Sequence, residues 1–333
     1  MAVKEHINEY FNSRAFMVLS AVALVVTAAL ALAMGVAPVP SDDAGMFFSL
    51  KGHLFEQGAT SAAVNVLCLL ATGVIILTLN KVFTFVRSTT HLFASAFYWL
   101  QVANPEGLVS LNPGTLLCLV SVLAMLPLFA SFQDRHAQRG IFLVFALIAA
   151  GCMWHYGAVA LLPAFLLGFF YMGVLNLKGM LAMLFGLITP FWIAFGLGLV
   201  TPADFHAPHI HGIWNMTWMW EGTLPIIVAL LAAVLGIVLA AINVPVIMNY
   251  RMQPRVYNAF LIITLAVTVI AMCLDYTAVA VFLPLLTLMV SIQMAHAHTL
   301  HATWPLRYLM ILLFVVACLI AAASALTLVV LPL

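Results

Sequence analysis

Charge is what this sequence has least of. Lysine, arginine, aspartate and glutamate make up 6% of its 333 residues, whereas a soluble domain carries about a quarter. Hydrophobic residues make up 66%, and the mean hydropathy is +1.19. A formal net charge of +1 argues against a nucleic-acid partner. The composition therefore indicates an integral membrane protein, in which residues 1–333 form one membrane domain without a soluble catalytic domain.

Paired cysteines and nucleotide-binding motifs are also missing. The five cysteines all lie inside apolar runs, and none forms a CxxC pair. This usage is typical of small core residues and argues against a disulfide framework or a zinc site. The polar connections on the predicted cytoplasmic side are short and contain no Walker loop or dinucleotide fingerprint. An ATP-driven pump built from this chain alone is therefore excluded.

Long apolar runs are abundant instead. A transmembrane helix needs roughly 20 apolar residues, and eleven runs approach or exceed that length, at 15–37, 61–80, 89–104, 113–131, 140–154, 157–175, 179–200, 223–247, 257–274, 276–294 and 308–331. They predict an all-α, polytopic transmembrane helix bundle of about eleven spans. The runs 89–104 and 140–154 are short, and the sequence leaves open whether they cross the membrane completely.

The basic residues orient these spans. If the N-terminus lies in the cytoplasm, every lysine and arginine except Lys51 falls on the inner side, as the positive-inside rule predicts. The C-terminus then lies outside. This topology predicts a cytoplasmic tail at 1–14 and two sizeable outer loops, at 38–60 and 201–222.

The first outer loop carries an acidic pair, Asp42 and Asp43. Paired carboxylates at the membrane surface can act as a general base or bind a divalent cation. They can equally cap the amphipathic surface helix that the segment GMFFSLKGHLFEQG predicts. Both interpretations stay open at this point.

The second outer loop carries His206, His209 and His211, followed by tryptophans that are typical of a membrane interface. Three histidines can bind zinc or copper, but Pro208 interrupts them and the spacing matches no metal motif. A second group, His296, His298 and His301, ends the tenth predicted span. The membrane core of about 30 Å separates the two groups, so the sequence predicts no shared metal site.

Charged residues at mid-membrane depth, which mark ion and proton paths, are not found securely inside any predicted span. The most polar residues there are Asn65, His91, Asn243 and Gln293, all nearer to helix ends than to helix centres. This pattern disfavours an ion-coupled transporter.

The layout resembles that of the C-type polytopic membrane glycosyltransferases, which use polyprenyl-linked sugars. In that family a first helix leads into an outer loop with an acidic pair and a surface helix, as Asp42, Asp43 and the segment after them do here. A helix pair with an arginine-bearing inner turn and a tight outer turn follows. The corresponding residues are Asn112, Pro113 and Gly114 at its start, Arg135 and Arg139 in the inner turn, and His155 and Tyr156 in the outer turn. The stretch 79–200 also resembles an uncharacterised membrane protein family of the Bacteroidota.

The glycosyltransferase resemblance implies that the first half of the chain has this fold and that the protein lies in a bacterial inner membrane. It implies that Asp42 or Asp43 deprotonates the acceptor or holds a divalent cation. His155, His206 or His209 would neutralise the departing lipid phosphate, with Tyr156 beside them and Lys51 as the one fixed outer cation. A polyprenyl phosphate-linked substrate and the membrane lipids would be its partners.

Two further hypotheses remain beside the enzyme. The chain can be a non-catalytic subunit that binds a membrane protein partner, because the small-residue run 321–325 in the last predicted helix permits close helix packing. It can also be a transporter for lipids or small solutes, which the prolines inside several spans favour.

Overall fold

The computed structural model describes residues 12–38, 45–47, 58–86, 90–134, 136–207, 210–215 and 223–300. Of these residues 79% are helical, and none forms a strand. The predicted all-α architecture is thereby confirmed for the described part of the chain.

Ten α-helices and four short 3-10 helices make up this part. The α-helices are α2 (Arg14–Ala33), α3 (Ala59–Phe83), α4 (Leu92–Val102), α5 (Pro113–Ala130), α6 (Gln138–Trp154), α7 (Leu161–Tyr171), α8 (Leu177–Gly196), α9 (Thr223–Ile247), α10 (Met252–Leu274) and α11 (Val279–Leu300). The 3-10 helices are η1 (Pro105–Gly107), η2 (Tyr156–Ala160), η3 (Pro202–Asp204) and η4 (Ile213–Asn215).

Seven of the described helices are long and apolar enough to cross a membrane, namely α2, α3, α5, α8, α9, α10 and α11. The chain is therefore a multi-pass membrane protein. The three other α-helices are apolar but shorter, and α4, with 11 residues, extends only about 16 Å. The predicted run 308–331 lies outside the described residues, so the total of eleven spans and their orientation stay predictions.

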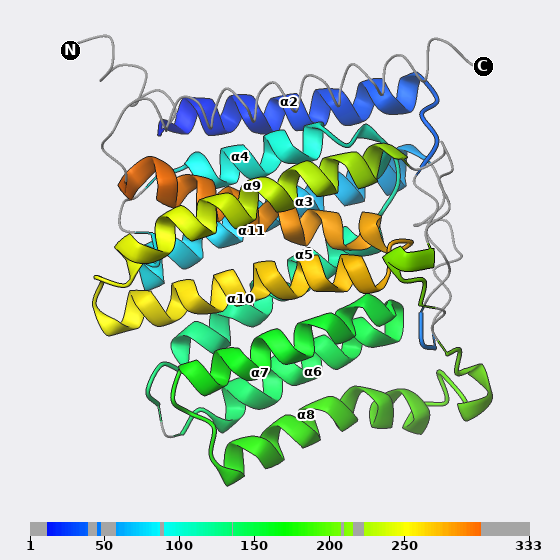
Figure 1. Ribbon diagram of the computed structural model, residues 1–333. Helices are drawn as coiled ribbons and strands as arrows, with labels where there is room; N and C mark the ends of the chain where they lie inside the picture. The colour runs from blue at the N-terminus through cyan, green and yellow to red at the C-terminus, as the bar shows by residue number, and fades with distance from the viewer. Residues whose placement is uncertain are drawn as a thin grey trace.

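The helices lie side by side, and successive α-helices alternate in direction (Figure 1). Figure 1 shows α2 along one side of the bundle, α8 along the opposite side and α11 between them. The turn between α10 and α11, which contains Asp275, marks one end of the bundle, called here the Asp275 end. The C-terminal turn of α11 marks the other, called here the His296 end.

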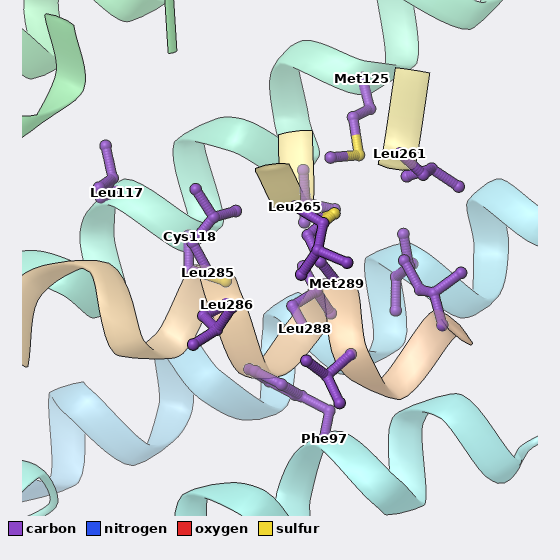
Figure 2. Close-up of a cluster of buried hydrophobic side chains, with 14 of the residues drawn as sticks. Phe97, Leu117, Cys118, Met125, Leu261, Leu265, Leu285, Leu286, Leu288 and Met289 are labelled. Carbon is purple, nitrogen blue, oxygen red and sulfur yellow. The ribbon is translucent and has the colours of Figure 1, made fainter. Parts of the chain in front are cut away.

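Helix α11 occupies the centre and packs against α4, α5, α9 and α10. In its most apolar stretch of 18 residues every residue of α11 is buried by protein. In the corresponding stretches of α2 and α8 only 22% and 17% of the residues are buried. Figure 2 shows the packing around α11, with Cys118 and Met125 from α5 and Leu265 from α10 beside it. Since lipid is as apolar as leucine, such contacts stabilise the bundle by close packing rather than by removal from water.

Helices α5 and α11 approach each other closely at Gly114 in α5. A Cβ atom at this position would lie 2.2 Å from the backbone oxygen of Val281, so only glycine fits. Just before it, the side chain of Asn112 caps α5 by accepting from the Gly114 N–H at 2.8 Å. The Asn112 amide also donates to the Ala280 carbonyl at 3.2 Å. In a regular helix this carbonyl would accept from residue 284, but Pro284 has no N–H to donate.

Candidate functional site

The Asp275 end contains a buried carboxylate that holds several chain segments together. Asp275 directly follows α10, and only 4% of its surface is exposed. Its Oδ1 accepts from the Thr277 hydroxyl at 2.7 Å and from the Thr277 N–H at 3.2 Å, with the His211 N–H at 3.5 Å. Its Oδ2 accepts from the hydroxyl of Tyr156. Buried carboxylates require such donors, and this one joins the α10–α11 turn to the turn after α6 and to the loop before α9.

His155 and Tyr156 form the second half of the site. His155 ends α6, and its Nδ1 accepts from the Gly157 N–H at 2.9 Å, which caps η2. Its ring stacks on that of Tyr156, with centroids 4.8 Å apart. A Cβ at Gly157 would lie 2.9 Å from this Nδ1, so residue 157 must be small.

Burial decides the charge of His155. Removal from water lowers the pKa of this imidazole to about 4, although the nearby negative charge of Asp275 acts in the opposite direction. The ring is therefore neutral at pH 7. Because Nδ1 is an acceptor, the proton lies on Nε2, and the ring presents a hydrogen-bond donor rather than a cation.

Both predicted outer loops reach this end of the bundle. In the first, the Phe47 N–H donates to the Met153 carbonyl at 3.4 Å. In the second, the His206 N–H donates to the Met46 carbonyl at 3.0 Å. The Phe47 ring lies against three other phenylalanine rings, Phe191, Phe195 and Phe205, at centroid distances of 5.8, 5.4 and 5.6 Å. The described part of the first loop is thus held between the end of α6 and the second loop.

The second loop has its own local order. Thr201 and Asp204 form a capping box at η3, in which Asp204 Oδ2 accepts from the Thr201 N–H at 2.7 Å and from its hydroxyl at 2.8 Å. These hydrogen bonds lower the pKa of the exposed Asp204 carboxyl. His206 follows directly, with its Nδ1 2.7 Å from the Asp204 carbonyl oxygen, and it is exposed.

The predicted site residues divide into two groups. His155 and Tyr156 lie together in the site, and His206 lies on the adjoining loop. The other four, Asp42, Asp43, Lys51 and His209, lie outside the described residues. Asp275 is not among the candidate residues of the sequence analysis. The Asp-x-Thr spacing after the span, typical of a side chain that bonds the backbone two residues on, was the available signal.

Within the described ranges, no group of three or more histidine, cysteine, aspartate or glutamate side chains could hold a metal ion. Comparison with known proteins found no family model, no curated protein and no solved structure that matches this chain. The function is therefore argued from the site itself.

Proposed function

We propose that this membrane protein is an enzyme that transfers a sugar from a polyprenyl-linked donor at the predicted outer face, in the manner of the C-type glycosyltransferases that its layout resembles. The observation that carries the proposal is the docking of the first loop at the site. Phe47 is bonded to the carbonyl of Met153, only two residues before His155.

The acidic pair is close in sequence to this contact. Asp43 is three residues before Met46, whose carbonyl accepts from His206. A substrate head group bound between these two loops would be within reach of a carboxylate of the pair and of the His155–Tyr156 turn.

Each group then has a defined task. The Asp42 or Asp43 carboxylate takes the proton of an acceptor hydroxyl, whose oxygen bonds to the anomeric carbon while the bond from that carbon to the phosphate oxygen breaks. Polyprenyl phosphate leaves. Neutral His155 donates a hydrogen bond from Nε2 to a phosphate oxygen, and Lys51 supplies the positive charge. Tyr156 donates a hydrogen bond to Asp275 and stacks on the ring of His155, so it holds that ring in place.

The test starts with native mass spectrometry of the protein extracted gently from its own membrane. We expect a bound polyprenyl phosphate or its glycan conjugate. Transfer from a labelled polyprenyl phosphate-linked sugar extract should then be lost in the Asp42→Ala/Asp43→Ala double variant at unchanged protein abundance. Asp134→Ala, which removes an exposed acid near the start of α6, serves as the matched control and should retain activity.

Two results would overturn this proposal. One is full transfer activity in the double variant. The other is a stoichiometric protein partner in the mass spectrum without any polyprenyl lipid, which would instead assign the chain as a non-catalytic subunit of a membrane complex.

A further inference from the structure

A second polar region lies inside the bundle near the His296 end, away from the site described above. An apolar junction of three helices borders this region. Gly236 in α9, Leu265 in α10 and Val290 in α11 meet there. A Cβ at Gly236 would lie 2.8 Å from Val290 Cγ2 and 3.2 Å from Leu265 Cδ1. The three helices therefore touch at this level, and the junction has no room for water.

Further toward the His296 end, the same three helices carry buried polar residues. Seven residues after Gly236 comes Asn243, seven residues before Leu265 comes Asn258, and three residues after Val290 comes Gln293. A separation of seven residues returns to the same face of a helix, about 10 Å further along its axis. His296 lies one turn beyond Gln293. These four residues, Asn243, Asn258, Gln293 and His296, are called here the polar layer.

The four side chains of the polar layer are buried, and two of them are joined by hydrogen bonds. The exposed fractions of its side chains are 0% for Asn243, Asn258 and His296, and 1% for Gln293. The Asn243 amide donates to the backbone carbonyl of Gln293 at 2.9 Å and to its side-chain Oε1 at 3.1 Å. The Asn258 amide donates to the Phe85 carbonyl at 2.8 Å, so the segment after α3 adjoins the layer.

Five polar atoms of the layer have no hydrogen-bond partner among the described residues. They are Asn243 Oδ1, Asn258 Oδ1, Gln293 Nε2 and both ring nitrogens of His296. Buried polar groups are normally satisfied, so five unsatisfied atoms toward the same end of three adjoining helices point to a ligand. The atoms comprise two carbonyl acceptors, an amide donor, and an imidazole that both donates and accepts. A small uncharged molecule with donors and acceptors matches this set, and water is the smallest.

We propose that the polar layer is an internal water-binding site, in which ordered waters bridge His296 to the amides of Asn243, Gln293 and Asn258. Buried waters in proteins typically make about three hydrogen bonds, so a few such molecules satisfy all five atoms. The site would place water beside an ionisable side chain inside the bundle, near the C-terminal end of α11. It does not depend on the proposed glycosyl transfer.

X-ray radiolytic labelling of the intact protein in lipid nanodiscs tests this directly. Radicals formed from bound water oxidise adjacent side chains even where bulk solvent does not reach them. We expect oxidation of His296 on the timescale of the exposed His206, and at least several-fold slower oxidation of Met289. Met289 lies on the same helix and is 1% exposed, and methionine is intrinsically the more reactive residue.

Substitutions test whether the oxidation of His296 depends on the polar layer. Asn243→Leu should reduce the oxidation of His296 several-fold. The matched control is Ser291→Ala, since Ser291 is buried on α11 but its hydroxyl bonds to the carbonyl of Leu288 at 2.7 Å. This control should leave the oxidation of His296 unchanged. The proposal is overturned if His296 stays unmodified while His206 reacts, or if Met289 reacts as fast as His296, which would indicate general solvent entry.

Thermal stability supplies an independent measurement. If waters occupy the layer, His296→Leu removes a hydrogen-bonding partner from them, and the melting temperature falls. If the layer is dry, the same substitution removes two unsatisfied nitrogens, and the melting temperature rises. A rise would overturn the proposal.

Discussion

The hydrogen bond from Tyr156 to Asp275 offers the sharpest test of the Asp275 end. Tyr156→Phe removes only the hydroxyl and retains the ring, which stacks on His155. A hydrogen bond to a charged group contributes about 1.5–3 kcal/mol. Because the Thr277 N–H and hydroxyl remain on the other carboxylate oxygen, we expect the free energy of unfolding to fall by about 2 kcal/mol.

Asp275→Asn, combined with Tyr156→Phe, gives a double-mutant cycle for this hydrogen bond. An asparagine can keep its oxygen toward Thr277 and turn its amide toward Tyr156, whose oxygen can accept. In the background of Tyr156→Phe the same amide is left without that acceptor. The two substitutions should therefore be coupled by about 1 kcal/mol, within the range for residues in contact.

The measurement is reversible unfolding of the four proteins in lipid bicelles, with Tyr171→Phe as the matched control because Tyr171 is 47% exposed. We expect the control to change the free energy of unfolding by less than about 0.5 kcal/mol. An equally small effect of Tyr156→Phe, or strict additivity of the two substitutions at the site, would refute the assignment of Asp275 as the residue that joins these segments.

Two further substitutions test the packing and the charge state of the site. Gly114→Ala places a Cβ 2.2 Å from the Val281 oxygen and should lower the free energy of unfolding by about 1–3 kcal/mol. The control Gly196→Ala, whose Cβ has no atom within 4 Å, should be neutral or stabilising. Equal melting temperatures of the two variants would contradict the close approach of α5 and α11. The pKa of His155 is lowered from 6.5 to about 4, so the unfolded chain binds the proton more readily. Stability is therefore full above about pH 6.5 and falls by about 3 kcal/mol as the pH drops to about 4. Unfolding at pH 7.5 and 4.5 checks this, and His155→Gln should make the difference between the two pH values smaller by about 3 kcal/mol. An unchanged pH dependence would show that other groups cause it.

The helices could be predicted from the sequence because the membrane core sets one length and one composition for every span. Each described α-helix falls on one of the predicted apolar runs. For α4 the sequence left open whether the run 89–104 crosses the membrane completely, and the helix covers only Leu92–Val102. The reason lies in the tertiary packing. Nearly all of α4 is buried against α2, α3 and α11, and a helix that is surrounded by protein does not have to match the thickness of the lipid.

The candidate site could be predicted only in part because its members are distant in sequence. His155 and Tyr156 were found through a layout resemblance, and no local pattern connects them to Asp275, 119 residues beyond Tyr156. A single acid after an apolar run is typical of a loop residue. Only the packing of α6, α10 and the loop before α9 shows that its carboxylate is buried and shared.

The burial of α11 explains why both polar regions involve the same helix. On α2 and α8, which the bundle covers little, a polar side chain bonds to its own helix, as Thr189 does to the Phe185 carbonyl at 2.6 Å, or must reach water. On α11, which α4, α5, α9 and α10 surround, such a side chain can be satisfied by neighbouring helices or by trapped water. Asp275 lies in the turn between α10 and this helix, and Gln293 and His296 lie near its C-terminal end.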